Sequence, residues 1–210
     1  MKLTSGSFKE GEAIPGEFAF AVPNAANHVS LSSNRNPHLV WDDVPSNTRS
    51  FALIVHDPDV PSKGDDVNQE GREVPTSLPR TNFYHWLAWN IPASTRSIAP
   101  GDQCNGVKPH GKPGPDAPQG WQHGINSYTD WFASDPNMKG DYYGYDGPCP
   151  PWNDSIVHHY VFTVYALDVE KLDVKGVKAD DLQAAIKGHV LAEAKLMGTY
   201  VLNPRLSSAG

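Results

Sequence analysis

Proline and glycine recur so often along this chain that long helices are not expected in it. The 210 residues include 18 glycines and 19 prolines, together about 18% of the chain where about 12% is usual. Proline lacks a backbone N–H and glycine loses the most conformational entropy in a helix, so both favour turns and loops. The apolar runs between them are short, and residues 51–55 form one of the longest. This spacing predicts short strands joined by many loops.

The length and charge of the chain limit its organisation and its partners. At 210 residues and 39% hydrophobic, the chain suits one well-packed core, so we expect a single domain over residues 1–210. Apolar runs of about five residues are far shorter than the roughly 20 of a membrane-spanning helix. The net charge of −7 offers no basic face for nucleic acid. Residues 1–6 show no start of a secretory signal, and we expect a cytoplasmic protein.

Three segments have the pattern of β-strands. Residues 51–55 are continuously apolar, which is typical of a strand buried on both faces. Residues 84–91 are aromatic and apolar, and residues 157–167 alternate with a period of two. The pattern of residues 1–40 predicts edge strands and turns. These segments predict a sheet with 51–55 as a central strand.

Two long segments and the C-terminal region follow other patterns. Residues 62–82 and 105–145 show neither strand nor helix periodicity, so we interpret them as loop insertions. Apolar residues at spacings of three and four predict short helices over 179–187 and 190–198. Strands first and helices last, without strand–helix alternation, indicate a mostly β fold with short C-terminal helices.

Polar side chains interrupt the strands where apolar neighbours would otherwise continue. They are Asp57 and Asp59, His85, and the pair His158 and Tyr160, which a period of two places on one face. A carboxylate beside an imidazole orients the ring and favours its charged form, so these groups could receive a small anion. The same carboxylates and imidazoles could instead hold a divalent metal that activates water. The spacing does not decide between an anion pocket and a hydrolase.

Each of these residues also has a simpler interpretation. Asp59 lies in an Asp-Pro-Asp turn, where such a side chain usually bonds nearby backbone. His85 alone would most often be a core histidine with its hydrogen bonds satisfied. His159 alternates to the face opposite His158, where it would face solvent or pack.

Other familiar catalytic patterns are weak or missing. There is no Gly-x-Ser-x-Gly sequence and no glycine-rich phosphate loop before a helix. Cys149 stands between two prolines, and nothing in the sequence indicates an activated thiol. With Cys104 it could form a disulfide, but two cysteines are too few for a disulfide scaffold. We expect neither a metal nor another cofactor.

Several short motifs, in order along the chain, carry a resemblance to a known family. They are residues 36–41 (NPHLVW), 57–61 (DPDVP), 84–87 with 90–92 (YHWL, NIP), 147–151 (GPCPP) and 158–162 with 165–167 (HHYVF, YAL). Over roughly residues 1–200, the chain resembles the phosphatidylethanolamine-binding protein (PEBP) family, which includes the Raf kinase inhibitor proteins and bacterial relatives. The resemblance implies an antiparallel β fold of two sheets, a small anion pocket at one end, and helices near the carboxyl terminus.

The resemblance also implies roles for individual residues. Asp57 and Asp59 match the acidic pair at the family's pocket, and His85 matches the pocket histidine of the central strand. Gly147 and Pro148 match the pocket rim.

Three further features match the family and one position departs from it. His158 and Tyr160 match the residues that meet the bound phosphate or similar anion. The Val60–Pro61 bond resembles one that is cis in the family, which would suit a tight turn. His159 stands where the family commonly has arginine, so a permanent charge and a bidentate donor are missing.

The expected function is therefore binding, without catalysis, of a phosphate group or another small anion, such as a phospholipid headgroup. A metal-assisted hydrolase using the same aspartates and histidines is the first alternative. The second is a protein-interaction module, such as a protease or kinase inhibitor, with the aromatic residues of segment 121–152 as its contact surface. The partner in such an interaction would be another protein or a second copy of this chain in a homodimer.

Overall fold

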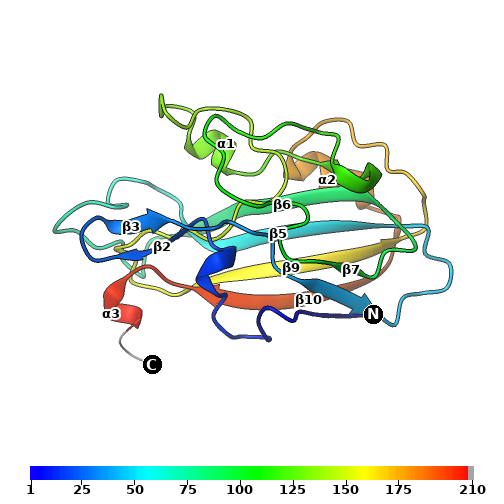
Figure 1. The fold of residues 1–210 in the computed structure, drawn as a ribbon, viewed down its shortest axis with the longest axis horizontal. Helices are drawn as coiled ribbons and strands as arrows, with labels where there is room; N and C mark the ends of the chain where they lie inside the picture. The colour runs from blue at the N-terminus through cyan, green and yellow to red at the C-terminus, as the bar shows by residue number, and fades with distance from the viewer. Residues whose placement is uncertain (208–210) are drawn as a thin grey trace.

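An antiparallel sheet of five strands forms the centre of the structure (Figure 1). The computed structural model describes residues 1–207. The strand order in this sheet is β10-β9-β5-β6-β8, so β5 lies in the middle, as the sequence predicts for residues 51–55. The strands are β5 (Ser50–Pro61), β6 (Arg80–Pro92), β8 (Gln122–His123), β9 (His158–Leu167) and β10 (Val190–Tyr200).

The N-terminal third of the chain supplies most of a second sheet and a hairpin. Trp41 in this second sheet packs edge-on against Phe51 of β5, with 5.4 Å between ring centroids, and both belong to the main core. Every pairing between the named strands is antiparallel. The predicted mostly β fold with antiparallel sheets is confirmed. The smaller sheet contains β1 (Lys2–Thr4), β4 (Leu39–Asp42) and β7 (Ser97–Ile98), and the hairpin contains β2 (Ala21–Asn24) and β3 (His28–Leu31).

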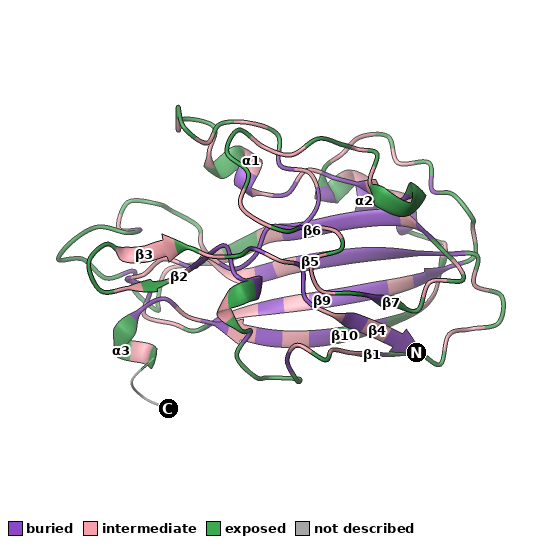
Figure 2. Ribbon diagram, viewed as in Figure 1, coloured by how far each residue is buried: buried purple, intermediate pink, exposed green. Residues whose placement is uncertain are grey.

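The central strand β5 is buried on both faces, as Figure 2 shows by the unbroken purple of its first half. Phe51, Leu53 and Val55 point into the core between the two sheets. Ala52 and Ile54 point to the other face, where they join a second apolar cluster. Burial on both sides explains why residues 51–55 are continuously apolar rather than alternating.

A short helix covers that second face. Helix α2 (Ala179–Ile186) packs Leu182 and Ile186 against the sheet, so the helix predicted over 179–187 is confirmed. The remaining helical segments are single turns and are peripheral to the sheet. They are α1 (Tyr128–Trp131), α3 (Pro204–Ser207) and the 3₁₀ turns η1 (Gly16–Phe18) and η2 (Pro118–Gly120).

The second helix predicted from the sequence, over 190–198, is wrong, because these residues form most of β10. Leucine, alanine, glutamate, lysine and methionine favour helices, but β10 pairs along its whole length with β9. Ala194 and Leu196 are buried while Glu193 and Lys195 are exposed, which is the period of two of a strand. Tertiary pairing overrides the local preference here.

The long segment between β7 and β9 is ordered and packed, despite having almost no regular structure. Its aromatic residues Trp121, Tyr142 and Tyr145 are fully buried, whereas Trp131 is 52% exposed. Tyr128 and Tyr142 form a third apolar cluster with Phe20. This segment therefore provides a wall beside one end of the central sheet. Within residues 1–207, no helix is long and apolar enough to cross a membrane.

Candidate functional site

A cavity of about 260 Å³, here called the pocket, opens at the end of the central sheet where β5 ends and β6 and β9 begin. Four of the predicted site residues line it: Asp57 from β5, His85 from β6, and His158 and Tyr160 from β9. Antiparallel pairing of adjacent strands brings together residues about 100 positions apart. The walls are mostly apolar and include Phe20, Val29, Leu31, Val60, Pro61, Val67, Phe83, Tyr128, Trp131, Phe132, Cys149, Pro150 and Pro151.

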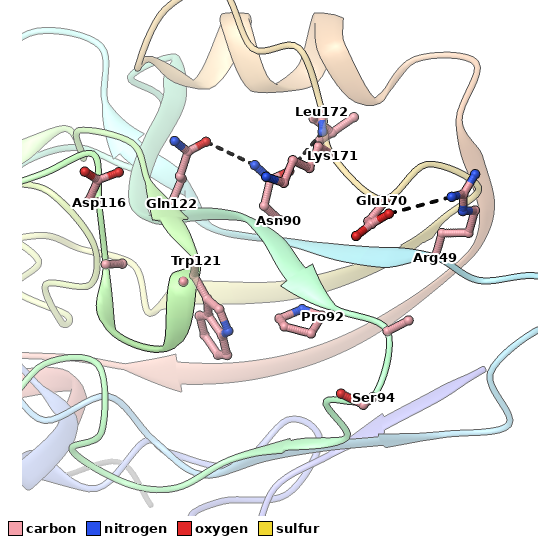
Figure 3. A pocket seen from close by; sticks show the side chains of 13 residues that line it. Arg49, Asn90, Pro92, Ser94, Asp116, Trp121, Gln122, Glu170, Lys171 and Leu172 are labelled. Carbon is pink, nitrogen blue, oxygen red and sulfur yellow. Dashed lines mark hydrogen bonds and ion pairs between the residues drawn. The ribbon is translucent and has the colours of Figure 1, made fainter.

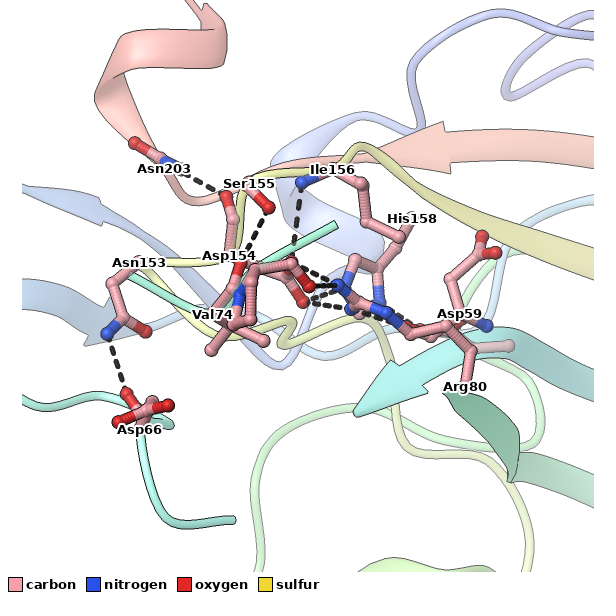
Figure 4. Close-up of polar contacts among 12 residues, drawn as sticks. Asp59, Asp66, Val74, Arg80, Asn153, Asp154, Ser155, Ile156, His158 and Asn203 are labelled. Carbon is pink, nitrogen blue, oxygen red and sulfur yellow. Dashed lines mark hydrogen bonds and ion pairs between the residues drawn. The ribbon is translucent and has the colours of Figure 1, made fainter. Parts of the chain in front are cut away.

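A chain of alternating charges leads from Arg80 through Asp154 and His158 to Asp57 at the pocket, and Figure 4 shows its first three members. The Arg80 guanidinium donates two hydrogen bonds to the Asp154 carboxylate, from Nη1 at 2.6 Å and from Nη2 at 3.0 Å. His158 donates from Nε2 to Asp154 at 2.9 Å and from Nδ1 to Asp57 at 2.6 Å. Asp154 and His158 are almost completely buried. The order is therefore arginine, aspartate, histidine, aspartate, with the last carboxylate at the pocket.

This chain fixes the protonation of His158. Burial alone would lower the pKa of His158, but hydrogen bonds and charges from Asp154 and Asp57 outweigh it and raise this pKa to about 9. Burial alone would raise the pKa of Asp154, and the donors His158 and Arg80 lower it instead. His158 is therefore an imidazolium at neutral pH, and both of its N–H groups are already used within the protein.

Sequence reasoning missed Arg80 and Asp154. Arg80 is the first residue of β6 and falls within the segment interpreted as a loop insertion over 62–82. Asp154 lies four residues before His158 in a stretch without periodicity, where nothing distinguishes it from other surface aspartates. Arg80 and Asp154 belong to the site because they contact each other across 74 residues of sequence. The local sequence around either residue does not indicate that contact.

His85 is held in one orientation by a hydrogen bond to Asp146, which is itself fixed by buried polar side chains. Its Nδ1 donates to the backbone oxygen of Asp146 at 2.7 Å. The Asp146 carboxylate accepts from Asn34 and Asn126, both at 2.8 Å, and lies 2.9 Å from the Lys112 Nζ. Burial lowers the pKa of His85, against the opposing charge of Asp57. The ring is therefore neutral, and its Nε2 has no hydrogen-bond partner within residues 1–207.

Tyr160 lines the pocket with a buried hydroxyl. The residue is 1% exposed, and its hydroxyl lies near the Asp57 carboxylate but makes no well-aligned hydrogen bond in the part of the chain that the structure describes. Burial, followed by the charge of Asp57 and with a smaller contribution from a weak hydrogen bond to that carboxylate, raises the pKa of this phenol well above its usual value. The hydroxyl thus remains protonated and available as a donor.

Asp59 does not line the pocket, contrary to the acidic pair that the resemblance implies. Its carboxylate turns to the other face of the sheet, where it accepts from the backbone N–H and the ring Nδ1 of His159, both at 2.8 Å. Its own backbone N–H donates to Asp57 at 2.7 Å. Residues 57–59 lie within β5, where a bulge interrupts the pairing with β6 between Asp57 and Val60. The two carboxylates point apart there, and only Asp57 lines the pocket.

Gly147 and Pro148 support the rim from behind, and residues 149–151 form the surface of the cavity there. The Gly147 carbonyl accepts from the Tyr128 hydroxyl at 2.7 Å, and the Pro148 carbonyl accepts from the Phe20 N–H at 2.9 Å. A Cβ on Gly147 would lie 2.1 Å from the Phe18 oxygen, so only glycine fits. Both residues are buried and position the rim.

Two other expectations concern covalent geometry. The cis bond expected at Val60–Pro61 is not found, since the cis peptide bond of residues 1–207 is Gly114–Pro115. Cys104 and Cys149 are both free thiols. Burial raises the pKa of Cys104 to about 11 and that of Cys149 to about 12. Neither thiol is activated as a nucleophile.

The arrangement of donors bears on the metal alternative. Both ring nitrogens of His158 bind carboxylates, and Asp154 is occupied by Arg80. No group of three or more histidine, cysteine, aspartate or glutamate side chains in residues 1–207 has the geometry of a metal site. At the pocket, only Asp57 and His85 retain lone pairs for a metal, which is fewer than the three protein ligands usual in a catalytic zinc site.

A second cavity, of about 890 Å³, lies at the opposite end of the central sheet, where β6 ends and β5 begins (Figure 3). None of the predicted site residues lines it. Asn90 bridges its wall by donating to Gln122 at 3.1 Å and accepting from the Leu172 N–H at 2.9 Å. An exposed pair, Arg49 and Glu170, borders it at 3.7 Å. These contacts tie loops together, and the indole N–H of Trp121, which lines this cavity, is buried without a hydrogen-bond partner within residues 1–207.

Known sequences resemble this chain over nearly its whole length. The profile of the family named "Phosphatidylethanolamine-binding protein" matches residues 4–201. The UPF0098 protein YbhB of Escherichia coli is 29% identical over 201 residues, covering 95% of this chain and 99% of YbhB. A UPF0098 protein of Methanothermobacter thermautotrophicus is 34% identical over 201 residues, covering 95% of this chain and 98% of the relative.

Solved structures resemble the fold as well. Escherichia coli YbcL, described as a new member of the mammalian PEBP family, has a TM-score of 0.66 at 26% identity, covering 95% of this chain and 97% of YbcL. The PEBP homologue CT736 of Chlamydia trachomatis has a TM-score of 0.62 at 30% identity, covering 95% of both chains. Together with the profile match, these similarities show that the chain belongs to the phosphatidylethanolamine-binding protein family.

Proposed function

We propose that the pocket binds a phosphate-bearing or other small anionic group, and that the protein holds this group without catalysing a reaction. The observation that carries the proposal is the contrast between the base of the pocket and its walls. Asp57, His85 and Tyr160 keep unused hydrogen-bonding capacity at the end of a cavity whose walls are mostly apolar. Few convergent polar groups in an apolar cavity are typical of a ligand site.

The charges behind the pocket make an anion tolerable there. Asp57 is negative, but His158 lies directly behind it, and Asp154 and Arg80 continue the alternation. The two cations and two carboxylates balance, so an entering anion meets no net negative charge from this chain of residues. The Tyr160 hydroxyl can donate a hydrogen bond to the anion. In residues 148–151 the backbone N–H of Cys149 is the only main-chain donor, because the other three residues are prolines.

The size of the pocket limits the ligand. A volume of about 260 Å³ is just below the roughly 300–1,000 Å³ common for small-molecule sites. A phosphate group with a short substituent fits this space, and the acyl chains of an intact phospholipid would remain outside it. The ligand that we propose is therefore a headgroup-sized molecule or the headgroup of a larger one.

The proposal of binding without catalysis rests on the state of the candidate catalytic groups. His158 has no free ring nitrogen, and burial raises the pKa of the partly exposed Cys149 thiol to about 12. His85 and Asp57 alone are a small ligand set for a catalytic metal. These features favour a binding protein over the metal-assisted hydrolase. A cytoplasmic location stays a prediction.

The His85→Ala variant is expected to lose binding of O-phosphorylethanolamine at pH 6 by at least tenfold. The Nε2 of His85 is free to contact the ligand directly, because Nδ1 is used on Asp146. A hydrogen bond to a charged group contributes about 1.5–3 kcal/mol, so its loss should weaken binding at least tenfold. Isothermal titration calorimetry with metal-stripped protein measures the change.

The matched control for that titration is His189→Ala. His189 is a surface histidine bonded to Asp168 at 2.8 Å, at the far end of β9 from the pocket. Its removal should leave binding unchanged. Binding to wild type that persists undiminished in His85→Ala contradicts the proposed site, and absence of binding in wild type contradicts the proposed ligand class.

The Tyr160→Phe variant separates the ligand contact from folding. Removing a buried hydroxyl that makes no well-aligned hydrogen bond should leave the free energy of unfolding unchanged or slightly raised. The same change removes a donor from the pocket and should weaken binding of O-phosphorylethanolamine about tenfold. Chemical denaturation and calorimetry on one sample measure both. A variant that is destabilised with unchanged affinity would show that the hydroxyl serves the fold instead.

One observation favours a protein-contact function for the mouth of the pocket. Leu31 and Trp131 both line it and are 63% and 52% exposed, although most large apolar side chains of the described chain are buried. A homodimer through this mouth would bury both residues. Sedimentation equilibrium of wild type and Trp131→Ser tests this alternative, since a dimer present only in wild type would support it.

A further inference from the structure

The hydrogen-bonding inventory of the pocket contains an excess of acceptors. His85 uses its single N–H on the Asp146 carbonyl, so its Nε2 presents a lone pair. Asp57 receives the His158 and Asp59 N–H groups and still presents lone pairs of its own. Among the residues that line the pocket, Tyr160 supplies the one side-chain O–H that makes no well-aligned hydrogen bond within residues 1–207. Both histidines at the pocket are thus unable to donate to a ligand in the neutral-pH state.

A fully deprotonated oxyanion does not match this inventory. A phosphate dianion has only acceptor oxygens, and it would face two acceptors, the His85 Nε2 and the Asp57 carboxylate. A buried acceptor placed against an acceptor costs free energy because neither group is satisfied. One additional proton at this point converts the mismatch into a hydrogen bond.

We propose that the pocket accepts an oxyanion only together with one proton, held between His85 Nε2 and a ligand oxygen. This inference rests on the proposed function and specifies the chemical form of the ligand. A phosphate monoester can bring the proton as its own P–OH group. A phosphodiester has no such proton, and His85 must then take one from solvent and become an imidazolium.

The surroundings of His85 allow it to carry this proton once an anion is present. Burial is the largest influence on this ring and lowers its pKa, as does the charge of His158, whereas Asp57, Asp146 and the backbone oxygen of Asp146 favour the charged ring. A bound anion adds a further negative charge directly at Nε2. The titratable groups that surround the ring are Asp57, His158 and Tyr160 on β5 and β9, Tyr128 on α1, Asp146 and Cys149 on the rim segment, and Lys112 behind Asp146.

The test is calorimetry at pH 8 with methyl phosphate and dimethyl phosphate, in Tris and in HEPES. The two buffers release different heats on losing a proton, so the difference in binding enthalpy gives the number of protons taken up. We expect uptake close to one proton for both esters. For methyl phosphate, whose second pKa is near 6, the affinity should fall about 50-fold between pH 6 and pH 8.

Two variants locate the proton. In His85→Gln, uptake with dimethyl phosphate should vanish, because the group that titrates has been removed. In His189→Gln, on the surface beside Asp168, uptake should equal that of wild type. If His85→Gln fails to fold, nitrogen NMR of the wild-type ring substitutes, and Nε2 should change from unprotonated to protonated when dimethyl phosphate is added.

The possible outcomes separate the two proposals. Binding of either ester with proton uptake near zero at pH 8 overturns the inference and leaves the anion pocket intact. No binding of either ester, with binding of ethylammonium instead, overturns both, because the acceptors would then serve a cationic group. Uptake near one proton that disappears in His85→Gln supports both proposals together.

Discussion

The Asp154→Asn variant is expected to unfold about 3–5 kcal/mol more easily than wild type, with a melting temperature lower by about 10 °C. The substitution keeps the shape of the side chain and removes one negative charge. Arg80 and His158 would then face each other as buried cations without the carboxylate that they share. Removing one partner of a buried ion pair is costly because the others remain desolvated. Urea denaturation and a thermal melt at pH 7 measure the change.

The matched control is Asp66→Asn, which removes the same charge from an exposed arginine pair. Asp66 contacts Arg72 at 3.1 Å, and both side chains are about half exposed. Pairs of this kind contribute little in water, so the change should stay within about 0.5 kcal/mol. A loss in Asp154→Asn that is no larger than in Asp66→Asn would show that the buried chain of charges does not stabilise the fold.

The second large effect is a loss of stability in mildly alkaline solution. The pKa of His158 is about 9 in the folded protein and near 6.5 in the unfolded chain. A group whose pKa is raised by folding contributes its full stabilisation below the unfolded pKa and loses it as pH rises through the folded pKa. The free energy of unfolding should therefore fall by roughly 3 kcal/mol between about pH 6.5 and pH 9 and above.

Urea denaturation at half-unit steps of pH measures this dependence. NMR of the His158 ring in the same range assigns it, because the protonated ring should persist until about pH 9. In Asp154→Asn, one of the two carboxylates that hold the proton is gone, so the folded pKa of His158 should be lower, and the decline should be smaller and should end at lower pH. A free energy of unfolding that is constant from pH 6.5 to 9.5 is incompatible with a charged His158 in the fold.

The sequence could predict those parts of the fold that depend on local periodicity. The continuous apolar run over 51–55 lies in β5, because a strand buried on both faces has apolar residues at every position. The alternation over 157–167 lies in β9, because a strand with one more deeply buried face shows a period of two. The residues 190–198 were misassigned because a strand paired along its whole length can be built from helix-favouring residues. No window of the sequence contains the partner strand.

The candidate site divides in the same way. Strand register places Asp57, His85, His158 and Tyr160 at one cavity, and their strand positions made that grouping predictable. Asp59 departs because it lies at the bulge of β5, and its carboxylate bonds to His159. Which nitrogen of a histidine is free depends on contacts between distant segments, so the state of His85 could be read only from the structure.

The distance along the sequence between Asp57 and His158 also bears on how the chain folds. The two side chains meet across 101 residues, and the intervening chain must be drawn in before β5 and β9 can pair. Closing so long a loop costs entropy that the contact repays only once it is made, which slows folding. The pocket therefore comes into existence late, with the pairing of the central strands. A nascent chain that has not yet reached β9 would have no pocket in which to bind the proposed ligand.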